Sequence, residues 1–154
     1  MAFIRPAQLS DLEQLSGMCE ALWPTSPAEE HAKEVRLILG GNASLVLTMP
    51  LSIFVAEETD GMLVGFVEVD VRSHADGCNP SKSVGYIEGW YVAEQYRQQG
   101  VGRKLLTKAE EWARYHNCVE IASDATIENE RSQRAHEALG YQVVDRCVHY
   151  RKDL

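Results

Sequence analysis

The sequence of 154 residues lacks several features that would assign it at once to a class of protein. No apolar run approaches the roughly 18 residues that a membrane span needs, and the N-terminus has no cationic start followed by an apolar stretch, as a signal peptide would. The four cysteines (Cys19, Cys78, Cys118 and Cys147) form no C-x-x-C pair. We therefore expect no membrane partner and no metal site, and we expect buried free thiols in a reducing cytoplasm.

Positive charge is also scarce. The net charge of −8 argues against nucleic acid as a partner, because nucleic-acid-binding domains carry a basic surface. The charge is uneven: residues 1–96 carry 14 acidic and 5 Lys or Arg side chains, whereas residues 97–154 carry 9 and 10. Either the acidic half is a solvated surface that keeps the protein soluble, or it binds a cationic substrate while the other half binds an anionic cofactor.

The length of the chain fits one domain, residues 1–154, and no internal repeat or low-complexity stretch divides it. Apolar residues recur at helical spacing after Ser10, which forms with Glu13 the capping-box pattern of a helix start. A second helix is predicted to begin at Pro27, because proline is favoured at the first helical position, and to run to Gly40-Gly41.

The rest of the chain alternates between strand and helix patterns. After a short first strand, the sequence predicts strands at 51–58, 62–72, 83–92 and 118–123, helices at 100–116 and 128–139, and one or two terminal strands at 141–152. Thr59-Asp60-Gly61 indicates a hairpin turn. The predicted fold class is α/β (α+β), a mixed central sheet with a strand–helix–strand crossover flanked by helices.

The segment Arg97-Gln98-Gln99-Gly100-Val101-Gly102 lies between a predicted strand and a predicted helix. A helix N-terminus presents unpaired N–H groups and the positive end of the helix dipole, so it favours an anion. Gly100 and Gly102 carry no side chain that would keep phosphate oxygens away, and Arg97 and Arg103 add positive charge. The alternative is a loop in which glycine serves tight packing of the helix on the strand.

This segment resembles the acetyl-CoA signature of the GNAT superfamily of N-acetyltransferases, an Arg or Gln followed by x-x-G-x-G/A, and the order of elements fits that fold along nearly the whole chain. The resemblance implies that acetyl-CoA is bound by Arg97, Gln98, Gln99, Gly100, Val101, Gly102 and Arg103. It also implies that the backbone N–H of Val92 stabilises the oxyanion, and that Asn129 and Ser132 line the pantetheine side of the cofactor.

Many members of this superfamily carry a tyrosine seven residues after the asparagine, and the resemblance implies that it protonates the departing thiolate. This sequence has His136 there, on a helix face shared with Asn129 and Ser132. His136 either donates that proton, since histidine titrates near neutral pH, or is a packed, hydrogen-bonded histidine. Tyr141, which lies beyond Gly140, and water are the other candidates.

A narrower resemblance is to bacterial aminoglycoside 6'-N-acetyltransferases. It rests on four short segments that occur in order, Leu22–Pro24, Ile87–Val92, Ala122–Asp124 and Arg146–Lys152. The resemblance implies that Glu88 and Asp124 face the aminoglycoside and that Trp23 packs against a sugar. Such residues suit a polycation that carries many hydroxyl groups.

Each of these residues also has a purely structural interpretation. Glu88 lies in an apolar strand, where a carboxylate needs a reason, and an arginine at the rim of the sheet would provide one. Asp124 suits the cap of the following helix, and Trp23 suits the core. Glu68 and Asp70 alternate with valines, so we expect them to form a solvated strand face, with lining of the same acidic pocket as the alternative.

The combined expectation is a cytoplasmic, acetyl-CoA-dependent N-acetyltransferase that acts on the 6'-amine of aminoglycosides and confers resistance. Acetyl is expected to pass directly in a ternary complex, with Glu88 as base, directly or through water. The alternatives are another polyamine or a peptide amine as acceptor, and a catalytically silent acyl-CoA-binding module. The resemblance also implies a homodimer, which the C-terminal strand is expected to form.

Overall fold

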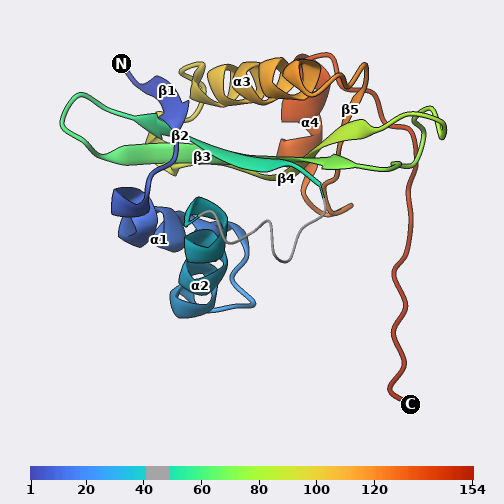
Figure 1. Ribbon diagram of the computed structural model, residues 1–154, viewed down its shortest axis with the longest axis horizontal. Coiled ribbons are helices and arrows are strands. Elements are labelled where there is room, and N and C mark those ends of the chain that lie inside the picture. Colours follow the sequence, from blue (N-terminus) through green and yellow to red (C-terminus); the bar gives the residue numbers. More distant parts are fainter. Residues whose placement is uncertain (41–48) are drawn as a thin grey trace.

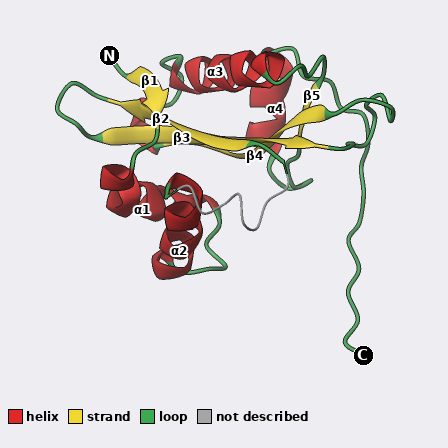
Figure 2. Cartoon of the chain, in the orientation of Figure 1, coloured by secondary structure: helices red, strands yellow, loops and turns green. Residues whose placement is uncertain are grey.

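The computed structural model describes residues 1–40 and 49–154. The helices and strands follow one another in the order β1 (Phe3–Pro6), η1 (Leu9–Asp11), α1 (Leu12–Leu22), α2 (Ala28–Leu39), β2 (Leu51–Glu57), β3 (Leu63–Arg72), β4 (Val84–Val92), η3 (Glu94–Tyr96), α3 (Val101–Tyr115), β5 (Ile121–Ser123) and α4 (Glu130–Ala138). Most of the predicted elements are therefore confirmed, with ends that differ by one to three residues (Figures 1 and 2).

The five strands form one sheet in the order β1-β2-β3-β4-β5. Strands β1 to β4 are antiparallel to their neighbours, whereas β5 runs parallel to β4. A parallel neighbour requires a crossover connection, and α3 provides it. This mixed sheet confirms the predicted α/β fold class with its strand–helix–strand crossover.

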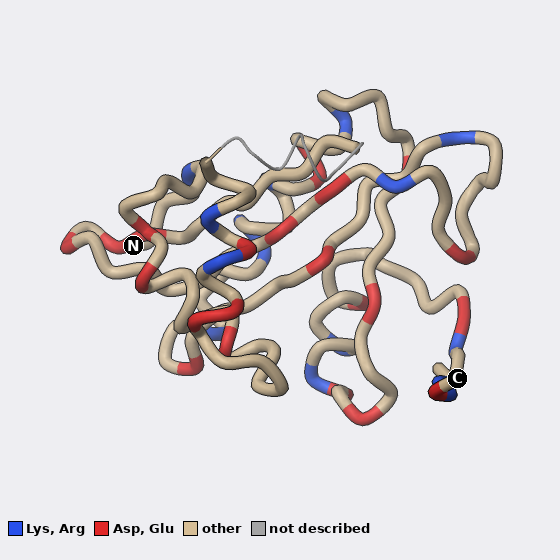
Figure 3. The backbone as a smooth tube through the Cα atoms, turned by 60° about the horizontal axis from the view of Figure 1, so that its bottom comes forward, with Lys and Arg blue, Asp and Glu red and all other residues tan. Residues whose placement is uncertain are grey.

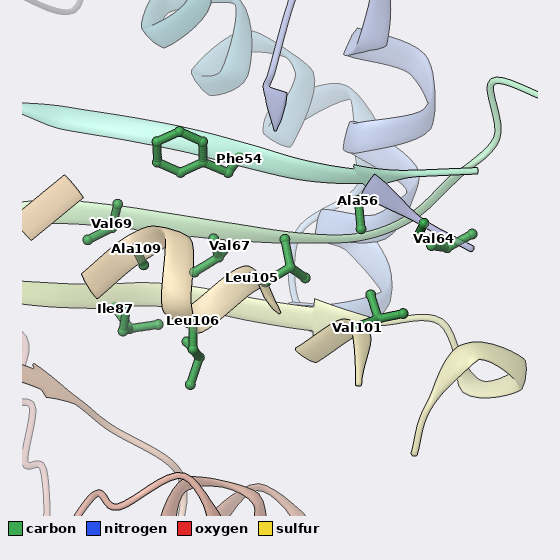
Figure 4. Packing of buried hydrophobic residues seen from close by; sticks show 11 residues of the cluster. Phe54, Ala56, Val64, Val67, Val69, Ile87, Val101, Leu105, Leu106 and Ala109 are labelled. Atoms are coloured by element: carbon green, nitrogen blue, oxygen red, sulfur yellow. The ribbon is translucent and has the colours of Figure 1, made fainter. Parts of the chain in front are cut away.

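Helices cover both faces of the sheet. Helix α3 lies over one face, and α1 and α2 lie over the other (Figure 1). Under α3, Leu105 and Leu106 are fully buried against Val67, Val69 and Ile87 of the two central strands (Figure 4). Each such side chain contributes about 1.5–3 kcal/mol when it leaves water, so this packing fixes α3 relative to β4.

Two predicted boundaries depend on glycine, and both are confirmed. Gly61 has φ +87° in the turn between β2 and β3, next to the predicted Asp60, whose carboxylate accepts a hydrogen bond from the N–H of Met62 (3.0 Å). Gly140 has φ +91° directly after α4. Glycine adopts this left-handed backbone without the steric cost that other residues meet.

The predicted cap at Ser10 is wrong. The chain first makes the short helix η1, which Gln8 caps, and the carboxylate of Asp11 accepts a hydrogen bond from the N–H of Gln8 (2.7 Å). Asp11 is held there by Arg5, which donates to both carboxylate oxygens (2.7 and 2.8 Å). At the second helix, Leu39 is the last residue and Gly40 its C-cap, whereas Gly41 lies outside the described residues.

The predicted terminal strands are also wrong for the chain taken alone. Residues 141–154 pair with no strand, and they run away from the body of the molecule to the C-terminus (Figure 1). We call residues 141–154 the C-terminal arm. Beyond Tyr141 its apolar side chains are exposed: Val148 is 71% and Tyr150 is 91% exposed. A strand needs a neighbouring strand for its backbone hydrogen bonds, and residues 1–40 and 49–140 present none to the arm.

Within residues 1–40 and 49–154, no helix is long and apolar enough to cross a membrane, and no cluster of His, Cys, Asp and Glu could hold a metal ion. All four cysteines are free, as predicted, but the prediction that they are buried is wrong for Cys78 and Cys147. Cys19 and Cys118 are buried, whereas Cys147 lies exposed in the C-terminal arm.

Candidate active site

A β-bulge at Glu88 shapes the centre of the sheet. In the pairing of β3 with β4, Glu68 lies opposite Gly89 and Val69 lies opposite Ile87, so Glu88 has no partner residue. An extra residue of this kind bends the strand and re-aims side chains. Ile87 contributes to the core under α3, whereas Glu88 projects to the opposite face, which α1 and α2 cover.

Three carboxyl groups meet on that opposite face: Glu68 and Asp70 from β3, and Glu88 from β4. We call them the carboxylate cluster, and Figure 3 shows acidic positions spaced along the central strands. Arg72 binds one oxygen of Glu88 through Nε (2.9 Å) and Nη2 (2.6 Å), and its Nε lies 4.0 Å from Oδ1 of Asp70. The arginine partner that the sequence left open for Glu88 is therefore present, but within the site.

The expectation of a solvated strand face at Glu68 and Asp70 is wrong. Burial is the main cause that raises the pKa of Glu68 to about 7, and the negative charges of Glu88, Asp70 and Glu34 add to it. Burial followed by a hydrogen bond with Glu88 raises the pKa of Asp70 to about 7. Oδ1 of Asp70 is buried and has no hydrogen-bond partner among the described residues. Proximity of like charges in a partly desolvated place explains both shifts.

Asp124 joins this face through Tyr86. It follows the carboxyl end of β5, and one of its oxygens accepts a hydrogen bond from the hydroxyl of Tyr86 (2.7 Å). The guanidinium of Arg72 stacks 3.5 Å above the ring of the same tyrosine. Asp124 is therefore tied to the carboxylate cluster by way of Tyr86 and Arg72, and the cap of the next helix is Asn129 instead.

Trp23 lies at the edge of the same face, just after α1. Its indole covers Gly89, where an added Cβ would come within 2.5 Å of the ring. The ring also contacts Phe66 and His31, at centroid distances of 6.0 and 5.8 Å, and the backbone oxygen of Trp23 is bonded to Nε2 of His31 (3.1 Å). The indole is only half-buried, so it belongs to the core and also presents an aromatic surface beside Glu88.

Strands β4 and β5 separate beyond Ile87. They pair at three positions only, the last of which joins Ile87 to Ser123, and no described residue pairs with β4 on that side farther along. The N–H of Ala93 donates to Val64 of β3 (2.9 Å). Because successive N–H groups of a strand point to opposite sides, the N–H of Val92 points into the gap that β5 leaves. The N–H of Val92 therefore has no strand partner among the described residues, and its role toward an oxyanion stays a prediction.

The loop before α3 has two residues in the left-handed region, Gln98 with φ +60° and Gly100 with φ +83°. A turn of this kind gathers backbone N–H groups into a concave arrangement that suits an anion. We call this loop, residues 97–102, the nest. Arg97 donates from Nε to the carbonyl of Val92 (2.8 Å), and Gln99 donates to the carbonyl of Gln95 (2.8 Å). Arg97 thus ties the loop to β4, and Gln99 ties it to η3. Apart from its chain neighbours, no atom of the described residues lies within 4 Å of an added Cβ at Gly100.

Helix α3 differs from the other α-helices at its first turn. An acidic side chain occupies the first turn of each of α1, α2 and α4, whereas α3 has none and carries Arg103 and Lys104 there. Acidic residues satisfy the positive end of a helix, so α3 leaves that end available to an external anion. The nest, the open space at Gly100 and this basic first turn together fit the diphosphate of coenzyme A.

Gly102 also has a packing role, which was the alternative interpretation of the two glycines. An added Cβ there would come within 2.9 Å of the indole of Trp90, so Gly102 lets α3 approach β4 closely. Nε1 of Trp90 is buried and has no partner among the described residues. Both interpretations of the two glycines are therefore needed: Gly100 permits the backbone conformation, and Gly102 permits the packing.

The residues predicted on the last helix lie together. Asn129 caps α4 by accepting a hydrogen bond from the N–H of Ser132 (3.1 Å). Both ring nitrogens of His136 are engaged, Nδ1 with the carbonyl of Ser132 (2.7 Å) and Nε2 with the hydroxyl of Ser123 (2.8 Å). The hydroxyl of Tyr141 donates to Glu110 (3.1 Å), and burial followed by that carboxylate raises the pKa of the phenol.

Sequence reasoning missed Arg72, Tyr86 and Ser123, which connect the expected residues to one another. Arg72 could have been found, since it follows Glu68 and Asp70 at two-residue spacing on one strand face. The contacts of Tyr86 and Ser123 join segments that are distant in sequence, and no local sequence pattern predicts them.

Comparisons with known proteins agree with this geometry. Residues 15–141 match the family model described as the acetyltransferase (GNAT) family. An aminoglycoside N(6')-acetyltransferase type 1 of Klebsiella aerogenes is 38% identical over 98% of this chain and 96% of its own. One from Serratia marcescens is 41% identical over 87% of each chain. The solved structure of AAC(6')-Iy with the bisubstrate analog CoA-S-monomethyl-acetylneamine aligns with a TM-score of 0.86 at 32% identity, covering 100% of this chain and 99% of that one.

Proposed function

The chain belongs to the acetyltransferase (GNAT) family, and on that premise we propose that it transfers acetyl from acetyl-CoA to the 6'-amine of aminoglycosides, and so confers resistance to them. The enzyme is an aminoglycoside 6'-N-acetyltransferase, and acetyl-CoA is its cosubstrate. The observation that carries this proposal is the position of two oppositely charged sites on one strand: β4 has the carboxylate cluster at Glu88 and the nest of α3 beyond Val92.

On the anionic side, the main chain would hold the cosubstrate. The amides at Gly100, Val101 and Gly102 would bind the diphosphate, with Arg97, Gln98, Gln99 and Arg103 around it. Acetyl-CoA supplies an activated acetyl group as a thioester. The N–H of Val92 faces the gap along which that thioester would lie, and there it would stabilise negative charge on the carbonyl oxygen. Asn129 and Ser132, at the start of α4, would line the pantetheine side.

On the cationic side, carboxylates would bind the aminoglycoside. Glu88 and Asp124 would attract its ammonium groups, and the exposed part of the Trp23 ring would pack on a sugar. Glu88 already accepts two hydrogen bonds from Arg72, and protonation would weaken both of them. We therefore assign to Glu88 the binding and orientation of the 6'-ammonium. His136, whose two ring nitrogens are both hydrogen-bonded, would have a structural role and help to hold α4 beside β4.

One kinetic comparison tests this function. Release of CoA thiol is followed with aminoglycosides that bear a 6'-amine, with matched ones that bear a 6'-hydroxyl, and with spermidine. We expect release with the first set only. Release with spermidine alone would favour another polyamine as the substrate, and the absence of release with every acceptor would favour a silent acyl-CoA-binding module.

We further propose that the protein is a homodimer in the cytoplasm and that it binds neither nucleic acid nor membranes. The C-terminal arm supports the dimer, since its extended backbone and bare valines would be covered by a strand edge of a second copy. The free, exposed thiol of Cys147 suits a reducing compartment. Light scattering on the full chain should give twice the mass of 17.3 kDa, and Val148→Asp should shift it toward the monomer.

A further inference from the structure

Glu68 differs from the other two members of the carboxylate cluster because it has no partner within residues 1–40 and 49–154. Arg72 holds Glu88 with two hydrogen bonds and lies 4.0 Å from Asp70. No donor and no cation of the described residues contacts Glu68. A carboxylate in a largely buried place without a cation is costly, and a cationic ligand would relieve that cost.

Among the residues that the structure describes, the groups that face Glu68 are acidic or neutral. Asp70 faces it from β3, Glu88 from β4 and Glu34 from α2, while the thiol of Cys19 lies on α1. Burial followed by these three charges raises the pKa of Glu68 to about 7. A general base is most effective when its pKa lies near the working pH, because it is then deprotonated and still basic enough to take a proton.

The register of the sheet also favours Glu68 over Asp70. Glu68 lies opposite Gly89, three residues before Val92, whereas Asp70 lies opposite Tyr86, six residues before it. Glu68 is thus the member of β3 nearer to the end of β4 where the thioester would lie. Asp70 also interacts with Glu88, which contributes to its raised pKa, and Oδ1 of Asp70 is buried.

We propose that Glu68 is the general base of the acetyl transfer and accepts, directly or through one water, the proton that the acceptor ammonium loses. The N–H bond breaks and its proton moves to the carboxylate of Glu68. The freed lone pair of nitrogen forms the new bond to the thioester carbon. The C–S bond then breaks, and its electron pair leaves on sulfur. The nitrogen loses its second proton to solvent, and the thiolate takes one proton from solvent, which gives the amide and the CoA thiol. This inference rests on the proposed function, in which Glu88 binds the ammonium.

Steady-state kinetics across pH tests this role. Glu68→Gln should lower kcat about 100-fold and leave the KM of acetyl-CoA unchanged, since loss of a general base costs about that much. The fall of kcat/KM below about pH 7 should vanish in this variant, because the group that titrates there is gone. Glu88→Gln should instead raise the KM of the amine. Its kcat/KM should still fall below about pH 7, and we call this fall the acidic limb of the pH profile.

A second variant separates a base from a merely structural carboxyl. Glu34→Gln removes a negative charge that faces Glu68, which lowers the pKa of Glu68 and should move the acidic limb of kcat/KM to lower pH. A residue that only supports packing would not produce such a shift. Glu68→Asp should restore part of kcat together with the limb.

Wild-type kcat and an unchanged acidic limb in Glu68→Gln would overturn the proposal, as would an unmoved limb in Glu34→Gln. If Glu68→Gln did not fold, the Glu34→Gln profile would decide alone. The measurements use any amine that the wild-type protein acetylates, spermidine included. Failure of 6'-amine substrates would therefore count against the proposed function and not against the role of Glu68.

Discussion

In the proposed function, the two ends of strand β4 would bind opposite charges by different means. Around Glu88, recognition of a cation depends on side chains, which are forced close together by a bulge and partly withdrawn from water. Beyond Val92, recognition of an anion depends on main-chain amides at a helix end, which glycine leaves uncovered. Without a ligand, the carboxylate cluster carries repulsion between like charges, whereas the N-terminus of α3 carries almost none.

This difference teaches where stability and function conflict. The N-terminus of α3 costs little folding free energy without its anion, since a helix terminus in water is common and the helix dipole is weak. The carboxylate cluster is costly, because burial and repulsion oppose ionisation of Glu68 and Asp70. Substitutions at the two ends should therefore affect the stability of the fold in opposite ways.

The largest effect is expected at the helix end. Arg103→Glu should weaken binding of acetyl-CoA about 100-fold, because it removes a charge-assisted hydrogen bond and adds repulsion. It should not lower stability, since an acidic residue in the first turn favours the helix dipole. Titration calorimetry and thermal unfolding measure the two quantities. Arg114→Glu makes the same charge change at the other end of α3 and should leave binding intact; equal losses in both variants would contradict the diphosphate site.

A smaller effect is expected from pH at the carboxylate cluster. The pKa of Glu68 is about 7 when folded against an ordinary value of 4.5, so the folded state retains a proton that the unfolded chain releases. Its contribution to stability is present at low pH and is lost as pH rises through 7. We expect the free energy of unfolding to fall by about 2 kcal/mol between pH 5 and pH 8.

Glu68→Gln is the control for this pH dependence, and its unfolding in urea should depend less on pH over the same range. The part that remains is due to Asp70, whose pKa is also raised to about 7. Asp11 does not interfere, because Arg5 lowers its pKa and it stays ionised at both values. A wild-type protein as stable at pH 8 as at pH 5 would show that Glu68 is ionised without cost.

The backbone of the nest gives a third prediction. Gly100→Val should weaken acetyl-CoA binding about 10-fold, since a left-handed backbone costs a branched residue about 1–2 kcal/mol. No neighbouring atom blocks a side chain at this position, so conformation and not bulk is tested. Gly100→Asn tolerates the same φ and should bind nearly as well. Equal weakening by valine and asparagine would point to bulk.

The smallest effect is expected at His136. Because both ring nitrogens are already bonded, to Ser123 and Ser132, His136→Gln should lower kcat less than about 10-fold and destabilise the fold by about 1 kcal/mol. Loss of a general acid would cost about 100-fold or more. A loss of that size in stopped-flow thiol release, with the fold intact, would assign the acid role to His136.

Sequence reasoning predicted what depends on local pattern. The face of α3, the turn at Gly61 and the end of α4 at Gly140 follow from residues close together in the chain, and each is confirmed. The nest at Gly100 was predicted for the same reason. The glycine-rich corner and the element order predicted a site for an anion at this end of β4, and that site stays a prediction.

The features that the sequence did not predict depend on pairing between segments that are distant in the chain. The bulge at Glu88 exists only in the register of β3 against β4, so the sequence of either strand alone does not contain it. The alternation of Glu68 and Asp70 with valines predicts a strand with one polar and one apolar face. It does not predict what covers the polar face. The C-terminal arm has a strand pattern without a strand partner in its own chain, and for that reason its prediction was wrong.

A crystal structure of the protein with CoA and an aminoglycoside that bears a 6'-amine tests the two-ended site most directly. We predict that the diphosphate contacts the amides of Gly100 to Gly102, and that the 6'-nitrogen lies within hydrogen-bond distance of Glu88, directly or through one water that also contacts Glu68. A diphosphate bound away from α3, or a 6'-nitrogen turned away from the carboxylate cluster, would contradict this arrangement.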